Sequence, residues 1–211
     1  MSKTLIQIFA KPPLAGKVKT RLIPDIGEQS ATAVYHYCLQ SNLEMLEQSG
    51  FEFQIWLTEQ SDHEVFKQQP AHLQQGNDIG KRMYHALSTG LKQGTQDGIQ
   101  QVILIGSDCL EITPKVLNRV VDKLHQHDLV FIPALDGGYV LIAARKTIDS
   151  RLFDGIEWSS DRVLIDSLHI AMDLGISTAV LNPLRDIDHV QDVAHYAELV
   201  ALLNRSSTEQ I

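Results

Sequence analysis

The chain has 211 residues, 44% of them hydrophobic, so it can bury a sizeable core in one large domain or two small ones. Its 18 Lys and Arg against 26 Asp and Glu give a net charge of −8, which argues against a nucleic-acid-binding protein. Two distant cysteines and the lack of a long apolar run argue against a disulfide framework and a membrane span, so we expect a cytoplasmic protein with no nucleic-acid or membrane partner.

Apolar runs alternate with helical patterns from one end of the chain to the other. Short apolar runs predict strands, and apolar residues that recur every three or four positions predict helices. In chain order the predicted elements are strand 3–10, helix 28–49 ending at Gly50, strand 51–57, helix 61–69 ending at Pro70, helix 79–92, strand 102–105, helix 114–126, strands 129–134 and 139–144, helix 160–174, strand 176–181 and helix 190–203.

This alternation predicts an α/β protein with a mostly parallel sheet and helices on both faces. The strands at 129–134 and 139–144 are too close together for a crossover connection, so we expect them to form an antiparallel hairpin. No repeat and no Pro/Ser-rich linker divides the chain. We therefore predict a single domain over residues 1–204, followed by a polar, frayed tail over 205–211.

The loop after the first strand is the most informative segment, because it concentrates positive charge in an acidic chain. Such a loop at the carboxyl end of a first strand is where α/β proteins hold nucleotide phosphates. Arginine can bind phosphate oxygens through two parallel hydrogen bonds, lysine acts as a point charge, and glycine allows close approach of the backbone. The loop matches neither a Walker A nor a GxGxxG motif, and a solvated basic turn is the alternative. The predicted phosphate-binding residues of this loop are Lys11, Gly16, Lys17, Lys19 and Arg21.

Two aspartates are candidates for binding a divalent cation. Asp108 directly follows the apolar run 102–105, and a carboxylate at the end of an interior parallel strand lies where α/β sheets bind ligands. There it could hold Mg²⁺ or Mn²⁺ against phosphate oxygens, although a turn aspartate that bonds its own backbone is the alternative. Asp188 could be a second metal ligand in the same crevice, or it could form a capping box with Gln191 before the last helix.

The segment between the two hairpin strands is a third candidate. Asp136 followed by glycine is a strong hairpin-turn signal. The functional interpretation is that Gly137, Gly138 and Tyr139 form a flat substrate-binding floor, with Asp136 facing the site as a polar contact or base.

Two weaker candidates lie elsewhere in the chain. Gly80 and Arg82 open a predicted helix and could add positive charge near the phosphates, or they could form an exposed helix start. Trp158 could stack on a sugar or base. A core position for Trp158, with Ser159 or Ser160 capping the next helix, is the alternative.

Together these segments resemble the bacterial selenodomain-associated transferases, a branch of the nucleotide-diphospho-sugar transferases with the GT-A fold. They are more distantly similar to the phospholactate guanylyltransferases and the molybdenum-cofactor nucleotidyltransferases. The resemblance covers roughly residues 3–200. The motifs that carry it are Phe9-Ala10-Lys11-Pro12, Gly16 to Leu22, Asp78-Ile79-Gly80, Arg82-Met83, Gly106 to Cys109, Pro133 to Tyr139, Trp158-Ser159, and Asp186-Ile187-Asp188 with Asp192.

The resemblance implies a GT-A three-layer α/β sandwich with a nucleotide at the first loop, a divalent metal at Asp108 and Asp188 as a second ligand. We therefore expect a metal-dependent transferase that uses a nucleotide or nucleotide-sugar and a small-molecule acceptor, with Mg²⁺ or Mn²⁺ as cofactor and Lys19, Arg21 and Asp136 in catalysis. Glycosyl transfer, nucleotidyl transfer with release of pyrophosphate, and a non-catalytic nucleotide sensor remain alternatives. The oligomeric state stays open, with a homodimer among the alternatives.

Overall fold

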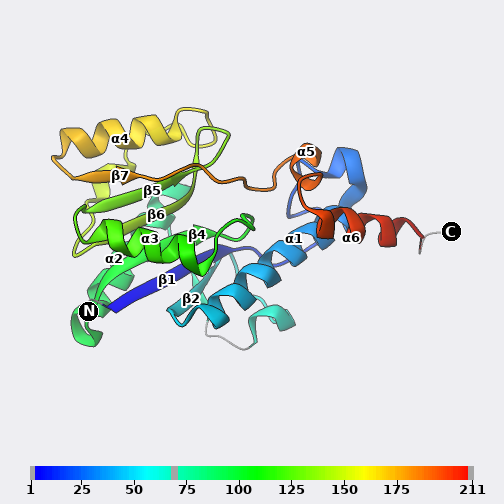
Figure 1. Ribbon diagram of the computed structural model, residues 1–211, viewed down its shortest axis with the longest axis horizontal. Coiled ribbons are helices and arrows are strands. Elements are labelled where there is room, and N and C mark those ends of the chain that lie inside the picture. Colours follow the sequence, from blue (N-terminus) through cyan, green and yellow to red (C-terminus); the bar gives the residue numbers. More distant parts are fainter. Residues whose placement is uncertain (1–2, 68–70, 209–211) are drawn as a thin grey trace.

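Within the described part of the chain, seven strands form one sheet in the order β3-β2-β1-β4-β6-β5-β7 (Figure 1). The computed structural model describes residues 3–67 and 71–208. Neighbouring strands are parallel except where β6 takes part, since β6 runs antiparallel to both β4 and β5. The strands span Lys3–Ala10 (β1), Glu52–Leu57 (β2), Ala71–Leu73 (β3), Ile99–Gly106 (β4), Leu129–Pro133 (β5), Tyr139–Arg145 (β6) and Thr178–Val180 (β7).

The predicted α/β class and the predicted β5–β6 hairpin are both confirmed. In β4 the side chains of Ile103 and Ile105 pack into one core cluster, whereas Val102 and Leu104 pack into another on the opposite face. All four are almost fully buried. An unbroken apolar run therefore became a strand covered on both faces, as its composition predicts.

Helices cover both faces of this sheet and make it the middle of three layers (Figure 1). Helices α1 (Ile23–Ser49) and α3 (Pro114–Leu124) pack on one face, and α2 (Ile79–Asp97) and α4 (Val163–Asp173) pack on the other. Gly50 ends α1 in a left-handed conformation with φ 77°, as predicted. Thr113 caps α3 by accepting a hydrogen bond from the amide of Val116 at 3.3 Å, again as predicted.

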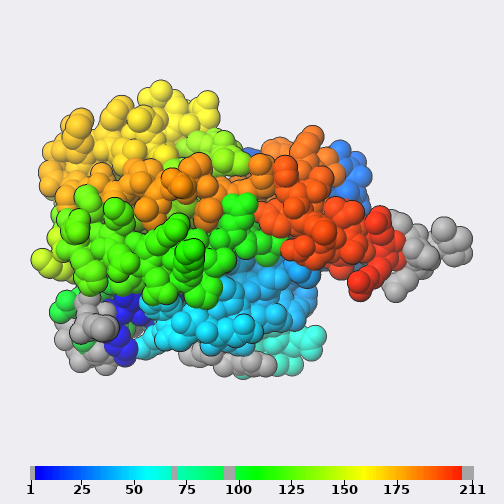
Figure 2. Space-filling view, viewed as in Figure 1, coloured from blue at the N-terminus to red at the C-terminus, as the bar shows by residue number. Residues whose placement is uncertain are grey.

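A third apolar cluster joins the C-terminal helices to the first half of α1. Helices α5 (Val190–Val193) and α6 (Ala197–Thr208) place Val193 and Leu199 against Leu22 and Val34 near the start of α1. In Figure 2 the orange and red C-terminal segment accordingly lies beside the blue early part of the chain. Cys38 packs into this cluster, where burial raises the pKa of its thiol to about 12. None of the described helices is long and apolar enough to cross a bilayer.

Several predicted boundaries differ from the structure. The single helix predicted at 190–203 is divided into α5 and α6, and α6 continues through residues 205–208 of the predicted frayed tail. The helix predicted at 61–69 is a 3₁₀ turn at Glu64–Phe66, while residues 68–70 and 209–211 lie outside the described residues. Strand β3 and a second 3₁₀ turn at Ser150–Phe153 were not predicted, because such short elements carry no periodicity.

Candidate functional site

The candidate site lies where β1 and β4 end side by side. These strands are parallel, and Phe9 pairs with Gly106 at their carboxyl ends. The basic loop and the segment that carries Asp108 therefore leave the sheet at the same edge. They border a pocket of about 450 Å³, large enough for a nucleotide. Its lining includes Phe9, Ala10, Lys11, Val18, Lys19, Thr20, Arg21, Tyr35, Thr58, Gln74, Ile79, Arg82, Gly106, Ser107, Asp108 and Asp188.

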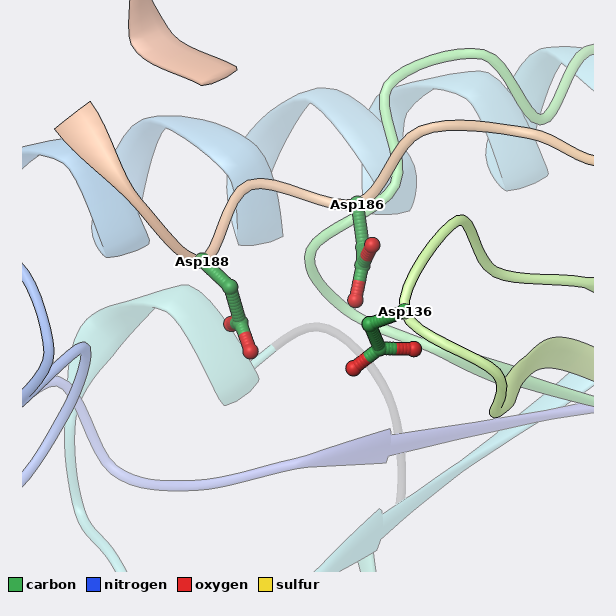
Figure 3. A group of neighbouring side chains, drawn as sticks. All are labelled: Asp136, Asp186 and Asp188. Carbon is green, nitrogen blue, oxygen red and sulfur yellow. The ribbon is translucent and has the colours of Figure 1, made fainter. Parts of the chain in front are cut away.

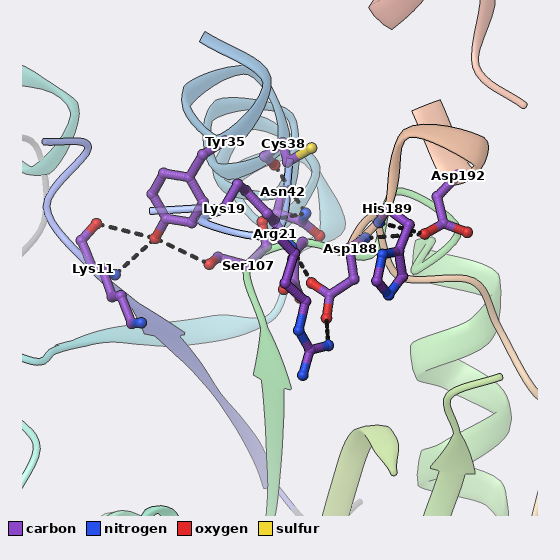
Figure 4. Close-up of polar contacts among 11 residues, drawn as sticks. Lys11, Lys19, Arg21, Tyr35, Cys38, Asn42, Ser107, Asp188, His189 and Asp192 are labelled. Atoms are coloured by element: carbon purple, nitrogen blue, oxygen red, sulfur yellow. Dashed lines mark hydrogen bonds and ion pairs between the residues drawn. The ribbon is translucent and has the colours of Figure 1, made fainter. Parts of the chain in front are cut away.

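Tyr35 of α1 holds the two loops in place (Figure 4). Its hydroxyl accepts a hydrogen bond from the amide of Lys11 at 2.7 Å and donates to the carbonyl oxygen of Lys11 at 3.0 Å. The same hydroxyl lies 3.2 Å from the Ser107 hydroxyl, so one buried phenol contacts the segments after both β1 and β4. Burial raises the pKa of Tyr35, which therefore stays protonated and able to donate at neutral pH.

Lys19 links the two predicted metal ligands. Its ammonium lies 2.8 Å from Asp108 Oδ2 and 2.9 Å from Asp188 Oδ1, and Arg21 Nη1 lies 2.7 Å from Asp188 Oδ2. The lysine side chain is only 5% exposed, against 33% for Asp108 and 29% for Asp188. The backbone of Lys19 adopts a left-handed conformation with φ 46°, which is uncommon for a residue other than glycine.

The charges of this group shift one another's pKa values. Burial alone would lower the pKa of Lys19, but the carboxylates of Asp108 and Asp188 raise it above its ordinary value. Burial tends to raise the pKa of Asp188, whereas Lys19 and Arg21 together bring it below its ordinary value. The lysine is therefore cationic and Asp188 anionic at neutral pH.

Asp188 reaches the site because of the residue before it. Ile187 is fully buried in the cluster formed by α1, α5 and α6. In an extended segment neighbouring side chains point to opposite sides, so Asp186 and Asp188 both turn away from that core. The predicted capping box of Asp188 with Gln191 is wrong. Asp192 occupies that role, since its Oδ2 accepts hydrogen bonds from the amides of Asp188 at 3.2 Å and His189 at 2.8 Å.

Three carboxylates converge beside the pocket (Figure 3). Oxygen atoms of Asp136, Asp186 and Asp188 lie within 4.8 Å of one another, with Asp136 on the loop between β5 and β6. Burial, followed by the charges of Asp108, Asp188 and Asp136, raises the pKa of Asp186 to about 6. Asp186 therefore ionises less readily than an ordinary aspartate.

The structure divides the predicted phosphate-binding residues into two sets. Lys11, Lys19, Arg21 and Arg82 line the pocket together with Asp108 and Asp188. Lys17 is exposed and does not line it. Gly16 does not line it either, and a Cβ there would lie 3.5 Å from the Glu28 carboxylate. Gly16 has a φ of 74°, which is typical of a glycine in a tight turn. This turn directs the following residues toward the pocket.

Gly80 and Trp158 form a packing contact near the pocket. A Cβ on Gly80 would lie only 2.2 Å from Cζ2 of the Trp158 indole, so the glycine makes room for the ring. The indole is partly buried against the core beneath α2. This position agrees with the alternative prediction, in which Trp158 is a core residue. The expected capping of α4 by Ser159 or Ser160 is not found, because Arg162 occupies the N-cap position without a side-chain hydrogen bond.

The predicted substrate floor is mainly a structural turn. Asp136 Oδ1 accepts a hydrogen bond from the amide of Gly138 at 3.0 Å. Gly137 has a φ of 94°, and a Cβ there would lie 2.1 Å from the carbonyl oxygen of Asp161. Tyr139 packs edge-on against Phe131, and its hydroxyl is buried. Of this segment, Asp136 alone joins the acidic group beside the pocket.

Sequence reasoning assigned no role to Tyr35, Gln74, Ser107 or Asp186, although Ser107 and Asp186 lie within motifs that carry the family resemblance. Gln74 lies next to β3 and donates from Nε2 to the carbonyl oxygen of Trp56 at 2.9 Å, a tertiary contact with no sequence signal. In the sequence alone, nothing distinguishes Tyr35 from the apolar residues of the same predicted helix. Asp186 could have been found, because Asp186 and Asp188 alternate around an isoleucine and so share one side of an extended segment.

The protein is similar to solved structures over nearly its whole length. A "putative nucleotide-diphospho-sugar transferase" from Desulfovibrio desulfuricans G20 is 28% identical and has a TM-score of 0.85, over 99% of this chain and 96% of that one. The CMP:2-keto-3-deoxy-manno-octonic acid synthetase complexed with CTP is 11% identical, with a TM-score of 0.57 over 95% and 99% of the two chains. The 4-diphosphocytidyl-2C-methyl-D-erythritol synthase from Anaerococcus prevotii DSM 20548 is 9% identical, with a TM-score of 0.57 over 95% and 99%.

The first of these similarities confirms the expected GT-A-like fold, and the other two show a shared fold alone. No curated protein matches the chain. Residues 41–160, more than half of the sequence, match the family described as "uncharacterized protein conserved in bacteria" (DUF2064), and the chain therefore belongs to this bacterial family.

Proposed function

We propose that the protein is a divalent-metal-dependent transferase that acts on a nucleotide-activated donor. The observation that carries this proposal is the convergence, at the carboxyl ends of β1 and β4, of four cationic side chains and two carboxylates in one pocket. Anionic phosphates match the cations, and a metal ion matches the carboxylates. The residues concerned are Lys11, Lys19, Arg21, Arg82, Asp108 and Asp188.

The cations would act on the phosphates of the donor. When the bond to the donor breaks, negative charge grows on the leaving phosphate, and fixed positive charges stabilise that charge. Lys19 suits this role because its ammonium is buried and held by two carboxylates. Losing one well-placed donor of this kind costs roughly 10²–10³-fold in rate.

The donor set of the site fits Mg²⁺ or Mn²⁺. Both ions prefer carboxylate oxygens. Asp108 and Asp188 would be ligands, and Asp186 and Asp136 add two carboxylates whose oxygens lie within 4.8 Å of those of Asp188. A bound cation would neutralise charge on the phosphates. Asp136 is exposed at this edge and would be the group that accepts a proton from the acceptor.

Glycosyl transfer is the lead reaction, because the similar protein from Desulfovibrio desulfuricans carries a nucleotide-diphospho-sugar transferase name. Nucleotidyl transfer with release of pyrophosphate is the second candidate, since four cations lining one pocket suit a triphosphate better than a diphosphate. The two reactions differ in the bond that breaks: sugar carbon to oxygen in the first, α-phosphorus to oxygen in the second.

The test is a panel of GTP, CTP and UDP-sugars with and without Mn²⁺, with thermal shift as the binding measurement. With water as the substitute acceptor of the transferred group, release of a nucleoside diphosphate indicates glycosyl transfer, and release of pyrophosphate indicates nucleotidyl transfer. Asp108→Asn should abolish turnover while the fold survives. Nucleotide binding with no turnover under any condition would instead identify a sensor module, and absence of binding by every nucleotide would overturn the proposal.

A further inference from the structure

Lys19 lies between Asp108 and Asp188, the two carboxylates that we expect to bind a metal ion. Its ammonium donates to Asp108 Oδ2 at 2.8 Å and to Asp188 Oδ1 at 2.9 Å. An ammonium that contacts two carboxylate oxygens at these distances occupies the space that a cation shared by Asp108 and Asp188 would need. The lysine is 5% exposed, so the ammonium cannot simply be displaced into solvent by a small rotation.

We propose that Lys19 occupies the shared cation position of Asp108 and Asp188 in the free protein, so that the divalent metal enters only together with the phosphates of the nucleotide. This inference rests on the proposed function and deepens it, because it identifies the true substrate as the metal–nucleotide complex. Phosphate oxygens would give the lysine a new partner, and the two carboxylates would then be free for the metal. Lys19 would thus control when the metal can bind, and it would also bind the phosphates directly.

Two further observations support an exchange of partners at Lys19. The backbone at this residue has φ 46°, a conformation that costs a lysine free energy and that the two ion pairs help to hold. Arg21 also pairs with Asp188, at 2.7 Å, but its side chain is 51% exposed and forms no ion pair with Asp108. When Lys19 turns to the phosphates, Asp188 therefore keeps Arg21 as a cationic neighbour at Oδ2, while its Oδ1 becomes free for the metal.

Arg21 offers the matched control for the experiment. Removing either cation beside an acidic site raises metal affinity somewhat through the change in charge alone. Of these two cations, however, Lys19 alone contacts both Asp108 and Asp188. The metal-exchange proposal therefore predicts a much larger gain for Lys19→Met than for Arg21→Met, and it predicts that the gain depends on Asp108.

The measurement is a titration of the full chain with Mn²⁺ alone, without nucleotide, followed by electron paramagnetic resonance of free Mn²⁺. We expect weak binding by the unmodified protein, at least tenfold tighter binding by Lys19→Met, and a change below threefold for Arg21→Met. Lys19→Arg, which keeps the charge, should bind as weakly as the unmodified protein. The double variant Lys19→Met/Asp108→Asn should lose the gain.

Two outcomes would overturn the metal-exchange proposal. One is a gain in Lys19→Met no larger than in Arg21→Met. The other is a gain that survives in Lys19→Met/Asp108→Asn, because the metal would then bind to Asp136, Asp186 and Asp188 without involving the lysine. Circular dichroism of each variant confirms that it is folded. The nucleotide panel tests the proposed function separately, since it measures nucleotide binding and turnover, whereas this titration contains no nucleotide.

Discussion

The amide of Ile187 donates a hydrogen bond to the carbonyl oxygen of Asp108 at 3.1 Å. This bond fixes the extended segment after β7 to the end of β4, two parts of the chain about eighty residues apart. Because Ile187 itself is buried beside α1, its position also determines the direction of the aspartates on either side of it. The acidic part of the site thus depends on the packing of one apolar side chain.

Ile187→Ala is therefore expected to affect both stability and the site. Removing a fully buried isoleucine side chain should lower the free energy of unfolding by about 2–4 kcal/mol. It should also weaken Mn²⁺ binding in the presence of nucleotide, since Asp186 and Asp188 lose their support. Urea denaturation and metal titration measure the two effects. The control is Ile165→Ala. The Ile165 side chain is 43% exposed, so this change should lower the free energy of unfolding by less than about 1 kcal/mol. Equal losses of stability in the two variants would contradict the role given to Ile187.

Two cations of the basic loop, Lys17 and Arg21, should behave differently on substitution. Arg21 lines the pocket, whereas Lys17 is exposed outside it. Arg21→Ala should lower nucleotide affinity about tenfold, the effect of losing one charge-assisted contact of roughly 1.4 kcal/mol. Lys17→Ala should change affinity less than twofold. Isothermal titration calorimetry at two salt concentrations measures both, and an equal loss for the two variants would mean that the bound nucleotide extends beyond the pocket.

Gly80→Ala should destabilise the protein because a methyl group cannot fit against the Trp158 indole. The Cβ would approach Cζ2 to 2.2 Å, so the ring or helix α2 must move, at a cost of about 1–3 kcal/mol. Thermal unfolding measures the loss, and tryptophan fluorescence should report the displaced indole. In the double variant Gly80→Ala/Trp158→Ala the alanine at 80 should cost little beyond the loss of the indole. If the losses of stability caused by Gly80→Ala and Trp158→Ala simply added up in the double variant, the proposed steric contact between the two positions would be contradicted.

The raised pKa of Asp186 predicts how stability depends on pH. Between the ordinary value of 3.8 and the folded value of about 6, the folded protein binds more protons than the unfolded chain. Stability should therefore fall as pH rises through this interval and should stay lower above it. Asp186→Asn removes this loss, so without metal the variant should be more stable than the original at pH 8, by roughly 1 kcal/mol after allowance for screening by water.

Urea denaturation at pH 4 and pH 8 in the presence of EDTA measures this effect. The stability gain of Asp186→Asn should be present at pH 8 and almost absent at pH 4, where Asp186 is mostly protonated in the folded protein. Asp122→Asn, at an exposed position on α3, is the control and should show no such difference. A gain of equal size at both pH values would exclude ionisation of Asp186 as the cause.

Local patterns were sufficient for most of the fold. Runs such as Val102–Ile105, helix signals such as Thr113-Pro114 and the short β5–β6 connection each depend on neighbouring residues, and the structure confirms them. The basic loop was also evident from the local sequence, and it leads from β1 into the pocket, but its phosphate-binding role stays a prediction. Strand β3 was not predictable in this way, because three residues acquire a strand conformation only by pairing with β2.

By itself the sequence determined the α/β class and the antiparallel hairpin, and it located a basic loop and an acidic residue that follows an apolar strand, since patterns within short stretches of chain indicate all of these. Only the tertiary structure decided that Lys19 bridges Asp108 and Asp188, that Asp186 joins the acidic group and that Lys17 and Tyr139 do not line the pocket. The physical reason is that Ile187 and Tyr35 hold the segments of the site in place through buried contacts with residues far away in the sequence, and a linear pattern carries no signal of which distant residues will pack together.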